Sequence, residues 1–346
     1  MSERRLFLDR SPGELRGVVT LDGRPERLII RRDDDDPRLT LGARLVARVA
    51  SVESALGSAF LDLGKGAQAI LPYKPDARPV QGQALIVEIR NEPRLEKLAV
   101  ARALGRAEGA PRLMEPPPEV ESELRRAAPG MEIATGRAAR EAADEAEAEA
   151  LETVHPLPEG GSLAIEPTRA LVAIDVDLGE RKGADAKRVT RQANLTALGS
   201  AARLLRLKGL GGIVVIDLVG RGHDGQALLA VARAAFAPDN PGVAIGPVGR
   251  FGTMELSLPR RTRSVLEILQ RPDGAPSDRA LAQRLIRRLQ AEAETDRGAR
   301  LVGRCAPSVA DAAAGLLPGL AQQLGARFSL RPDANFARER LEAGVE

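Results

Sequence analysis

The chain has 346 residues, 43% of them hydrophobic and 29% charged, which is the balance of a globular protein with two or three domains. Six Phe, one Tyr and no Trp exclude a core built on large rings and a broad surface of stacking platforms. The net charge of +3 is too small to indicate a nucleic-acid partner by itself, and one cysteine excludes a disulfide framework or a four-thiolate zinc site within one chain.

No stretch of the sequence approaches the ~18 consecutive apolar residues that a membrane span requires. The N-terminal residues also lack the apolar core of a signal peptide. A single cysteine is typical of a reducing compartment. We therefore expect a soluble, cytoplasmic protein that has no membrane partner.

Residues 1–36 predict two strands, 13–21 and 25–32, joined by a turn at Asp22-Gly23. The run of aspartates at 33–36 then marks an exposed junction. We expect this N-terminal β segment to pack on the later α/β region of the chain.

Residues 37–106 contain short β-type runs separated by Gly and Pro. These runs lie at 42–52, 58–64, 67–73 and 83–90. Their length and spacing favour a small barrel over a parallel sheet. Residues 107–153 follow as a Pro-rich linker and an acidic helix over 140–152, whose charge run indicates a solvent-exposed helix.

Residues 154–270 show strands that alternate with helices. The strands are expected at 162–167, 170–177 and 211–220, and the helices at 189–208 and 225–237. This alternation predicts an α/β layer with a mostly parallel sheet. Residues 271–346 predict a small α/β tail domain, so the expected fold class is α/β plus all-β.

Two apolar strands of the predicted α/β layer each end in aspartate, at Asp175 with Asp177 two residues later, and at Asp217. Functional groups gather at the carboxyl ends of parallel strands, so Asp175 and Asp217 should project together at one sheet edge. Paired carboxylates are hard oxygen ligands that suit Mg²⁺ or Mn²⁺ better than zinc. The alternative is that these aspartates cap helices or pair with arginines.

Three segments around these aspartates, 157–179, 194–219 and 249–261, resemble the catalytic region of the ribonuclease E/G family. Residues 47–75 resemble the family's S1-type RNA-binding barrel, and residues 11–28 resemble its N-terminus. The resemblance implies an OB-fold of the S1 type, followed by a DNase-I-like α/β catalytic layer and a small C-terminal domain.

The resemblance also implies an activity. Members of the family are endoribonucleases that cut single-stranded RNA with Mg²⁺-activated water, leaving a 5′-phosphate and a 3′-hydroxyl. Asp175 and Asp217 match the metal-binding aspartates, with Mg²⁺ expected and Mn²⁺ as an alternative. Asp177 stands where the family usually has asparagine, and would either join the catalytic site as a third ligand or hydrogen-bond to it.

Four residues are candidates for RNA contacts. Phe60 matches a stacking phenylalanine of the family's barrel, although a Phe on a barrel strand can equally be a core residue. Ile70 stands at the second ring position, and Tyr73 is a substitute three residues later. Lys97 matches a basic residue near the cleavage site. Arg250 is a candidate to bind phosphate with its bidentate fork, the alternative being a surface salt bridge.

The sequence departs from the family in two ways. Ala134 replaces the arginine of the pair that recognises a 5′-monophosphate, Arg137 lies three residues on, and most of the subdomain that follows is missing. We therefore expect cutting without 5′-end sensing in RNA processing or decay. The cysteine pair that links family subunits through zinc is absent, so no zinc is expected and any homo-oligomer would form through other surfaces. The alternative function is a non-catalytic S1-type RNA-binding or ribosome-associated protein.

Overall fold

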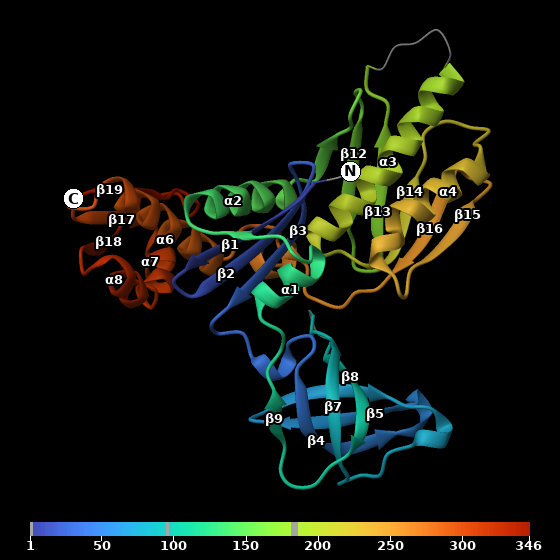
Figure 1. Cartoon of the computed structure of the whole chain (residues 1–346), viewed down its shortest axis with the longest axis horizontal. Coiled ribbons are helices and arrows are strands. Elements are labelled where there is room, and N and C mark those ends of the chain that lie inside the picture. Colours follow the sequence, from blue (N-terminus) through green and yellow to red (C-terminus); the bar gives the residue numbers. More distant parts are fainter. Residues whose placement is uncertain (1–2, 95–96, 181–185) are drawn as a thin grey trace. The chain divides into compact units, whose positions relative to one another are not determined.

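The computed structural model describes residues 3–94, 97–180 and 186–346, which fold into two compact units. The first unit comprises Met1–Arg24, Leu28–Glu145 and Val265–Glu346. The second comprises Pro25–Arg27 and Ala146–Ser264. Figure 1 shows the elements of both units.

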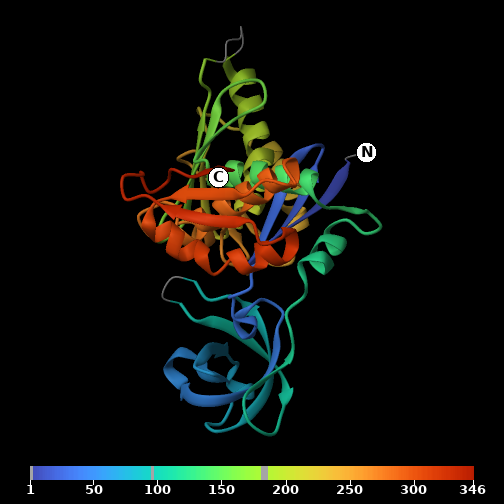
Figure 2. The same cartoon turned by 90° about the vertical axis from the view of Figure 1, so that its left-hand side faces the viewer.

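A closed five-stranded barrel forms one part of the first unit (Figure 2, blue and teal). Its strands are β4 (Arg44–Glu53), β5 (Ser58–Gly64), β6 (Ala67–Pro72), β7 (Ala84–Asn91) and β8 (Ala99–Arg106). They pair in the cyclic order β4-β5-β6-β8-β7, with β6 and β8 parallel and the other pairs antiparallel. Alternate aliphatic residues, such as Leu45, Leu61 and Val87, fill the interior, and the partly buried ring of Tyr73 packs against them. The predicted barrel is confirmed and is consistent with an OB-fold.

The N-terminal residues form three strands, where the sequence predicted two. These are β1 (Arg4–Ser11), β2 (Glu14–Leu21) and β3 (Arg24–Arg32), and the short β10 (Ile133–Ala134) joins the sheet beside β1. The residues after the barrel are not only a linker, because β9 (Arg112–Glu115) pairs with β4 and α1 (Val120–Ala127) packs on the N-terminal sheet.

Helix α2 (Arg137–Leu151) has one buried face, so the prediction of a solvent-exposed acidic helix is wrong. Its buried small residues are Ala139, Ala143, Ala146 and Ala150, spaced three or four apart. Alanine at this spacing gives a narrow apolar stripe, which the many acidic residues of the helix hide in the sequence.

The core of the first unit contains buried ion pairs. Arg16, fully buried, donates from Nη2 to Asp9 Oδ2 at 2.7 Å and from Nη1 to Asp144 Oδ1 at 2.7 Å. Arg287 donates from Nη1 to the buried Glu14 Oε1 at 2.8 Å. Buried charges are tolerated only when paired and hydrogen-bonded, so each of these residues depends on its partner.

The C-terminal part of the first unit carries helices on a three-stranded sheet of order β18-β17-β19. Its elements are α5 (Val265–Leu269), α6 (Asp278–Thr295), β17 (Leu301–Cys305), α7 (Pro307–Ala314), α8 (Leu317–Leu324), β18 (Phe328–Pro332) and β19 (Glu342–Val345). Cys305 is buried here, and burial raises the pKa of its thiol.

The described residues of the second unit form a six-stranded sheet on which α3 and α4 pack, and the prediction of a mostly parallel sheet is wrong. Its elements are β11 (Val154–Pro156), β12 (Ser162–Pro167), β13 (Val172–Asp177), α3 (Ala186–Lys208), β14 (Gly212–Asp217), α4 (Gly225–Phe236), β15 (Ala244–Val248) and β16 (Thr253–Leu258). The order is β11-β12-β13-β14-β16-β15, and among these described strands only β13 and β14 pair in parallel. Hairpins at either end of the sheet reverse the chain, so the α3 crossover alone joins parallel neighbours.

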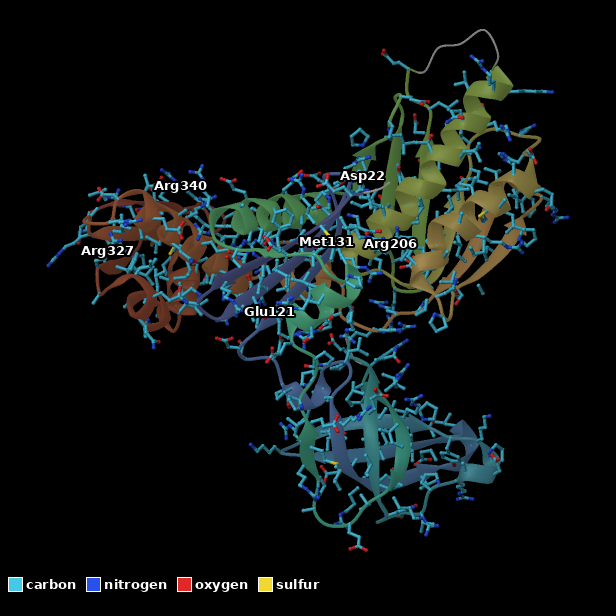
Figure 3. All side chains as sticks on the ribbon, in the orientation of Figure 1. Asp22, Glu121, Met131, Arg206, Arg327 and Arg340 are labelled. Atoms are coloured by element: carbon cyan, nitrogen blue, oxygen red, sulfur yellow. The ribbon has the colours of Figure 1, made fainter. Side chains whose placement is uncertain are left out.

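Residues 25–27 belong to the second unit through Arg206, near the end of α3 (Figure 3). Its guanidinium lies 2.7 Å from Asp239 Oδ2 and 3.3 Å from Glu26 Oε1.

None of the helices in the described part of the chain combines the length and apolarity needed to span a bilayer.

Candidate active site

Asp175 and Asp217 are register partners on β13 and β14, the one parallel pair of the second unit's sheet. Directly paired residues project to the same face, so the two carboxylates stand side by side. Both side chains are exposed. The residues before them, Ile174 and Ile216, are buried on the opposite face, where α3 and α4 pack (Figure 1). The sequence-predicted aspartates are thus brought together at one edge of the sheet.

The electrostatics of this pair favour a bound cation. Among the described residues, neither Asp175 nor Asp217 has an ion-pair or hydrogen-bond partner. Like charges directly opposite each other destabilise a sheet, so the fold keeps this pair at a cost that a cation would offset. Within the same described residues no cluster of three or more His, Cys, Asp or Glu side chains could hold a metal. Two carboxylates with solvent suit Mg²⁺, which keeps several of its waters.

Asp177 projects from the same strand two residues beyond Asp175 and is also exposed. Its Oδ1 accepts a hydrogen bond from the Gly179 amide, within the turn that follows β13. One carboxylate oxygen is therefore occupied by the local backbone. This hydrogen bond joins Asp177 to its own turn and not to Asp175 or Asp217, so the role of Asp177 at the site stays a prediction.

Asn194 on α3 was not singled out as a site residue from the sequence, yet it fixes the loop that follows Asp217. Its side chain is 1% exposed, donates from Nδ2 to the Val219 carbonyl at 3.0 Å, and accepts from the Val219 amide at 3.1 Å. Gly220 then passes so close to Thr190 that a Cβ would lie 2.6 Å from its methyl group. The sequence held one signal for this role: Asn194 is a polar residue on the otherwise apolar helix face that carries Ala193 and Ala197.

The turn between β15 and β16 carries Arg250 and Phe251. The Gly249 amide donates to the Thr253 carbonyl at 2.8 Å, and the Gly252 amide donates to the Gly249 carbonyl at 3.0 Å. The Leu218 amide donates to the Gly252 carbonyl at 3.1 Å, which fastens the turn directly beyond Asp217. The structure therefore brings predicted Arg250 to the edge that carries the aspartates. Phe251 was not predicted.

His223 lies in the loop between β14 and α4, against this turn. Its Nε2 is 3.3 Å from the position that a Cβ on Gly252 would take. That nitrogen is buried and has no hydrogen-bond partner among the described residues. The imidazole thus packs beneath the turn that carries Arg250.

The barrel candidates differ in their surroundings. Phe60 is half-buried on the outer face of β5, between the core residues Ala59 and Leu61, and pairs with Ile70 on β6. Lys97 is exposed. Tyr73 is also partly exposed, but it packs against the barrel core with its hydroxyl buried.

The segment around Ala134, which matches the family's 5′-monophosphate pocket, is exposed. Ala134 ends β10, and Arg137 begins α2 with its Nε 2.7 Å from Glu141 Oε1. The guanidinium nearest to Ala134 in sequence is therefore already paired with a carboxylate.

A sheet that holds two unneutralised carboxylates in register, beside a fixed turn with an arginine, has the donor set of a divalent-cation site. Residues 135–262, which include the whole site, match the Ribonuclease E/G family. The resemblance predicted from the sequence is therefore confirmed for this region.

Named relatives agree with the family match. Ribonuclease E of Haemophilus influenzae is 37% identical over 115 residues, which are 32% of this chain and 12% of the relative. Ribonuclease E of Escherichia coli is 36% identical over 114 residues, 32% of this chain and 11% of the relative. The chloroplastic ribonuclease E/G-like protein of Arabidopsis thaliana is 34% identical over 122 residues, 34% of this chain and 12% of the relative. The matched region thus spans about an eighth of these relatives' length.

Proposed function

We propose that the chain is a metal-dependent endoribonuclease that hydrolyses single-stranded RNA to 5′-phosphate and 3′-hydroxyl ends. The observation that carries the proposal is the register of Asp175 with Asp217, two carboxylates without described partners inside the region that matches the family. The second unit would be the DNase-I-like catalytic layer. Residues 37–106 would be the S1-type domain, and the C-terminal residues a small α/β domain.

Asp175 and Asp217 would hold Mg²⁺, with Mn²⁺ as the alternative. The ion, when bound, supplies an activated water and neutralises charge that develops on the phosphodiester. Arg250 extends from the fastened turn and would hold a phosphate oxygen with its planar fork. Asn194 keeps the 218–220 loop in place, so it positions Asp217 and the turn without touching RNA.

Single-stranded RNA would also contact the barrel. Phe60 lies on the outer face, beside Ile70, where a base can stack on its ring. Lys97 would pair with the RNA backbone, and Tyr73 is the weaker platform because its ring packs on the core. Recognition of a 5′-monophosphate is not expected, because Ala134 provides no guanidinium and Arg137 is paired with Glu141.

The proposal is tested by RNA cleavage with Mg²⁺, compared with EDTA and with Asp175→Asn and Asp217→Asn. Each substitution should lower the cleavage rate about a hundredfold or more, since the ion contributes several kcal/mol to the transition state. Glu255→Gln is the matched control. This carboxylate is also exposed on the same sheet face, next to Val215 rather than next to Asp175. Cleavage that survives both aspartate substitutions would show that the site is wrong.

A non-catalytic RNA-binding protein is the second candidate, favoured by the short segment between the barrel and the second unit. Tight RNA binding with no cleavage in any metal would establish it. Dimerisation without zinc and a cytoplasmic location stay predictions.

A further inference from the structure

Phe251 has an unusual environment for one of the chain's few rings. It is 78% exposed, whereas Phe236 is buried and the other aromatic side chains are partly buried. Exposing a phenyl ring to water costs free energy that burial would recover. A turn of this kind accepts many polar residues, so folding alone does not require a ring at this position.

The ring is held in a defined place. The Arg250 guanidinium lies 4.5 Å from the centroid of the Phe251 ring, in a cation–π arrangement. The turn beneath it is fixed by the three backbone hydrogen bonds described above, one of which joins Gly252 to Leu218. Because Leu218 directly follows Asp217, this hydrogen bond fixes the turn that carries Arg250 and Phe251 next to the sheet edge that holds the carboxylates.

This combination fits an unpaired nucleotide. The face of the phenyl ring that the guanidinium does not cover offers a stacking surface for any base, and the guanidinium offers donors for the phosphate of the same nucleotide. A protein partner would also cover a ring, but it gains nothing from the adjacent pair of carboxylates, which repel acidic surfaces and attract a cation-bridged phosphate.

We propose that Phe251 is a base-stacking platform for the nucleotide next to the phosphate held at Asp175 and Asp217. This inference rests on the proposed function, because it assumes a single-stranded nucleic acid at that site. It adds a base contact in the second unit to the one expected at Phe60 in the barrel.

The absence of tryptophan from the sequence allows a direct test. Phe251→Trp in the Asp175→Asn background gives a full-length protein with a single Trp and no expected cutting. Titration with a 10-nucleotide single-stranded RNA should quench its fluorescence, because a stacked base quenches indole. A set of oligonucleotides with one abasic position each should identify one position whose removal abolishes the quenching.

Phe336→Trp is the matched control, because Arg340 covers that ring in the same manner, at 4.3 Å, within the C-terminal part (Arg340 is labelled in Figure 3). Its fluorescence should not change. Phe60→Trp reports separately on the barrel. Phe251→Ala and Phe251→Leu should both weaken RNA binding about 5- to 150-fold, the effect of losing one stacked base, so apolar bulk alone should not restore affinity.

Quenching at Phe60→Trp without quenching at Phe251→Trp would overturn the inference and leave the proposed function standing. Equal quenching at Phe251→Trp and Phe336→Trp would also overturn it, as would full affinity in Phe251→Ala. Quenching at Phe251→Trp in a protein whose wild type never cuts RNA would support the stacking platform and refute the nuclease. No RNA binding at all would refute both.

Discussion

Acid should destabilise the second unit through His155. This residue lies on β11, is 4% exposed, and its Nε2 has no hydrogen-bond partner among the described residues. Burial, reinforced by the nearby charge of Lys208, lowers the pKa of His155 from 6.5 to about 4.

The sign follows from the lowered pKa. Between pH 6.5 and 4 the unfolded chain binds a proton at His155 that the folded chain does not, so stability falls as the pH decreases through this range. A difference of about 2.5 pKa units corresponds to a maximum of ~3 kcal/mol, and about 2.5 kcal/mol of it is lost by pH 4.5.

His155→Asn removes the titration and keeps a short polar side chain. Urea unfolding followed by far-UV circular dichroism at pH 7.5 and 4.5 measures the effect. The wild type should lose about 2.5 kcal/mol more than the variant across this range. Tyr73, the one tyrosine, lies in the barrel, so its fluorescence follows the first unit and should show no difference between the two proteins. Equal acid sensitivity of both proteins by circular dichroism would refute the reasoning.

Three further predictions concern the loop, the turn and the substrate end. Asn194→Ala should lower the free energy of unfolding by about 1–3 kcal/mol and slow RNA cleavage, because the Val219 amide and carbonyl lose their partners; unchanged urea midpoints would contradict it. Gly252→Ala should reduce cleavage more than overall stability, since φ is +88° and the new Cβ would press on His223; a fully active variant would show that the turn is not part of the site. Oligonucleotides with 5′-hydroxyl and 5′-monophosphate ends should be cut at comparable rates, and a strong monophosphate preference would count against the Ala134 argument.

The sequence was most informative where apolar residues alternate. The barrel strands follow this pattern, so the barrel could be predicted. The meeting of Asp175 with Asp217 could be predicted because each ends the apolar part of a strand that neighbours a helix in the sequence. The direction of the other strands could not, because it depends on the hairpins at the two ends of the sheet and on the pairing of β14 with β16 rather than with β15. Strand β1 was missed because its charged residue Asp9 is buried only by virtue of Arg16, which lies on the neighbouring strand.

Two residues of the candidate site, Asn194 and Phe251, could not be predicted from the sequence, also for physical reasons. In the sequence, Asn194 looks like an ordinary polar residue of a helix. It becomes important only because folding brings the Val219 backbone within hydrogen-bond distance of its side chain. Phe251 is a hydrophobic residue whose exposure is a property of the folded turn, so no periodicity in the sequence reports it.

The discontinuous first unit has a consequence for synthesis. Residues 146–264 are consecutive and can fold as they leave the ribosome, whereas the N-terminal strands must wait for the helix that carries Arg287. Until then Glu14 can pair with Arg32 on β3, at 3.0 Å, but it lacks the guanidinium of Arg287, which meets its other carboxylate oxygen at 2.8 Å in the finished fold. A nascent chain from which residues 146–264 have emerged but Arg287 has not would therefore carry a finished second unit and an incomplete first one, which limited proteolysis of stalled nascent chains would detect as protection of the second unit alone.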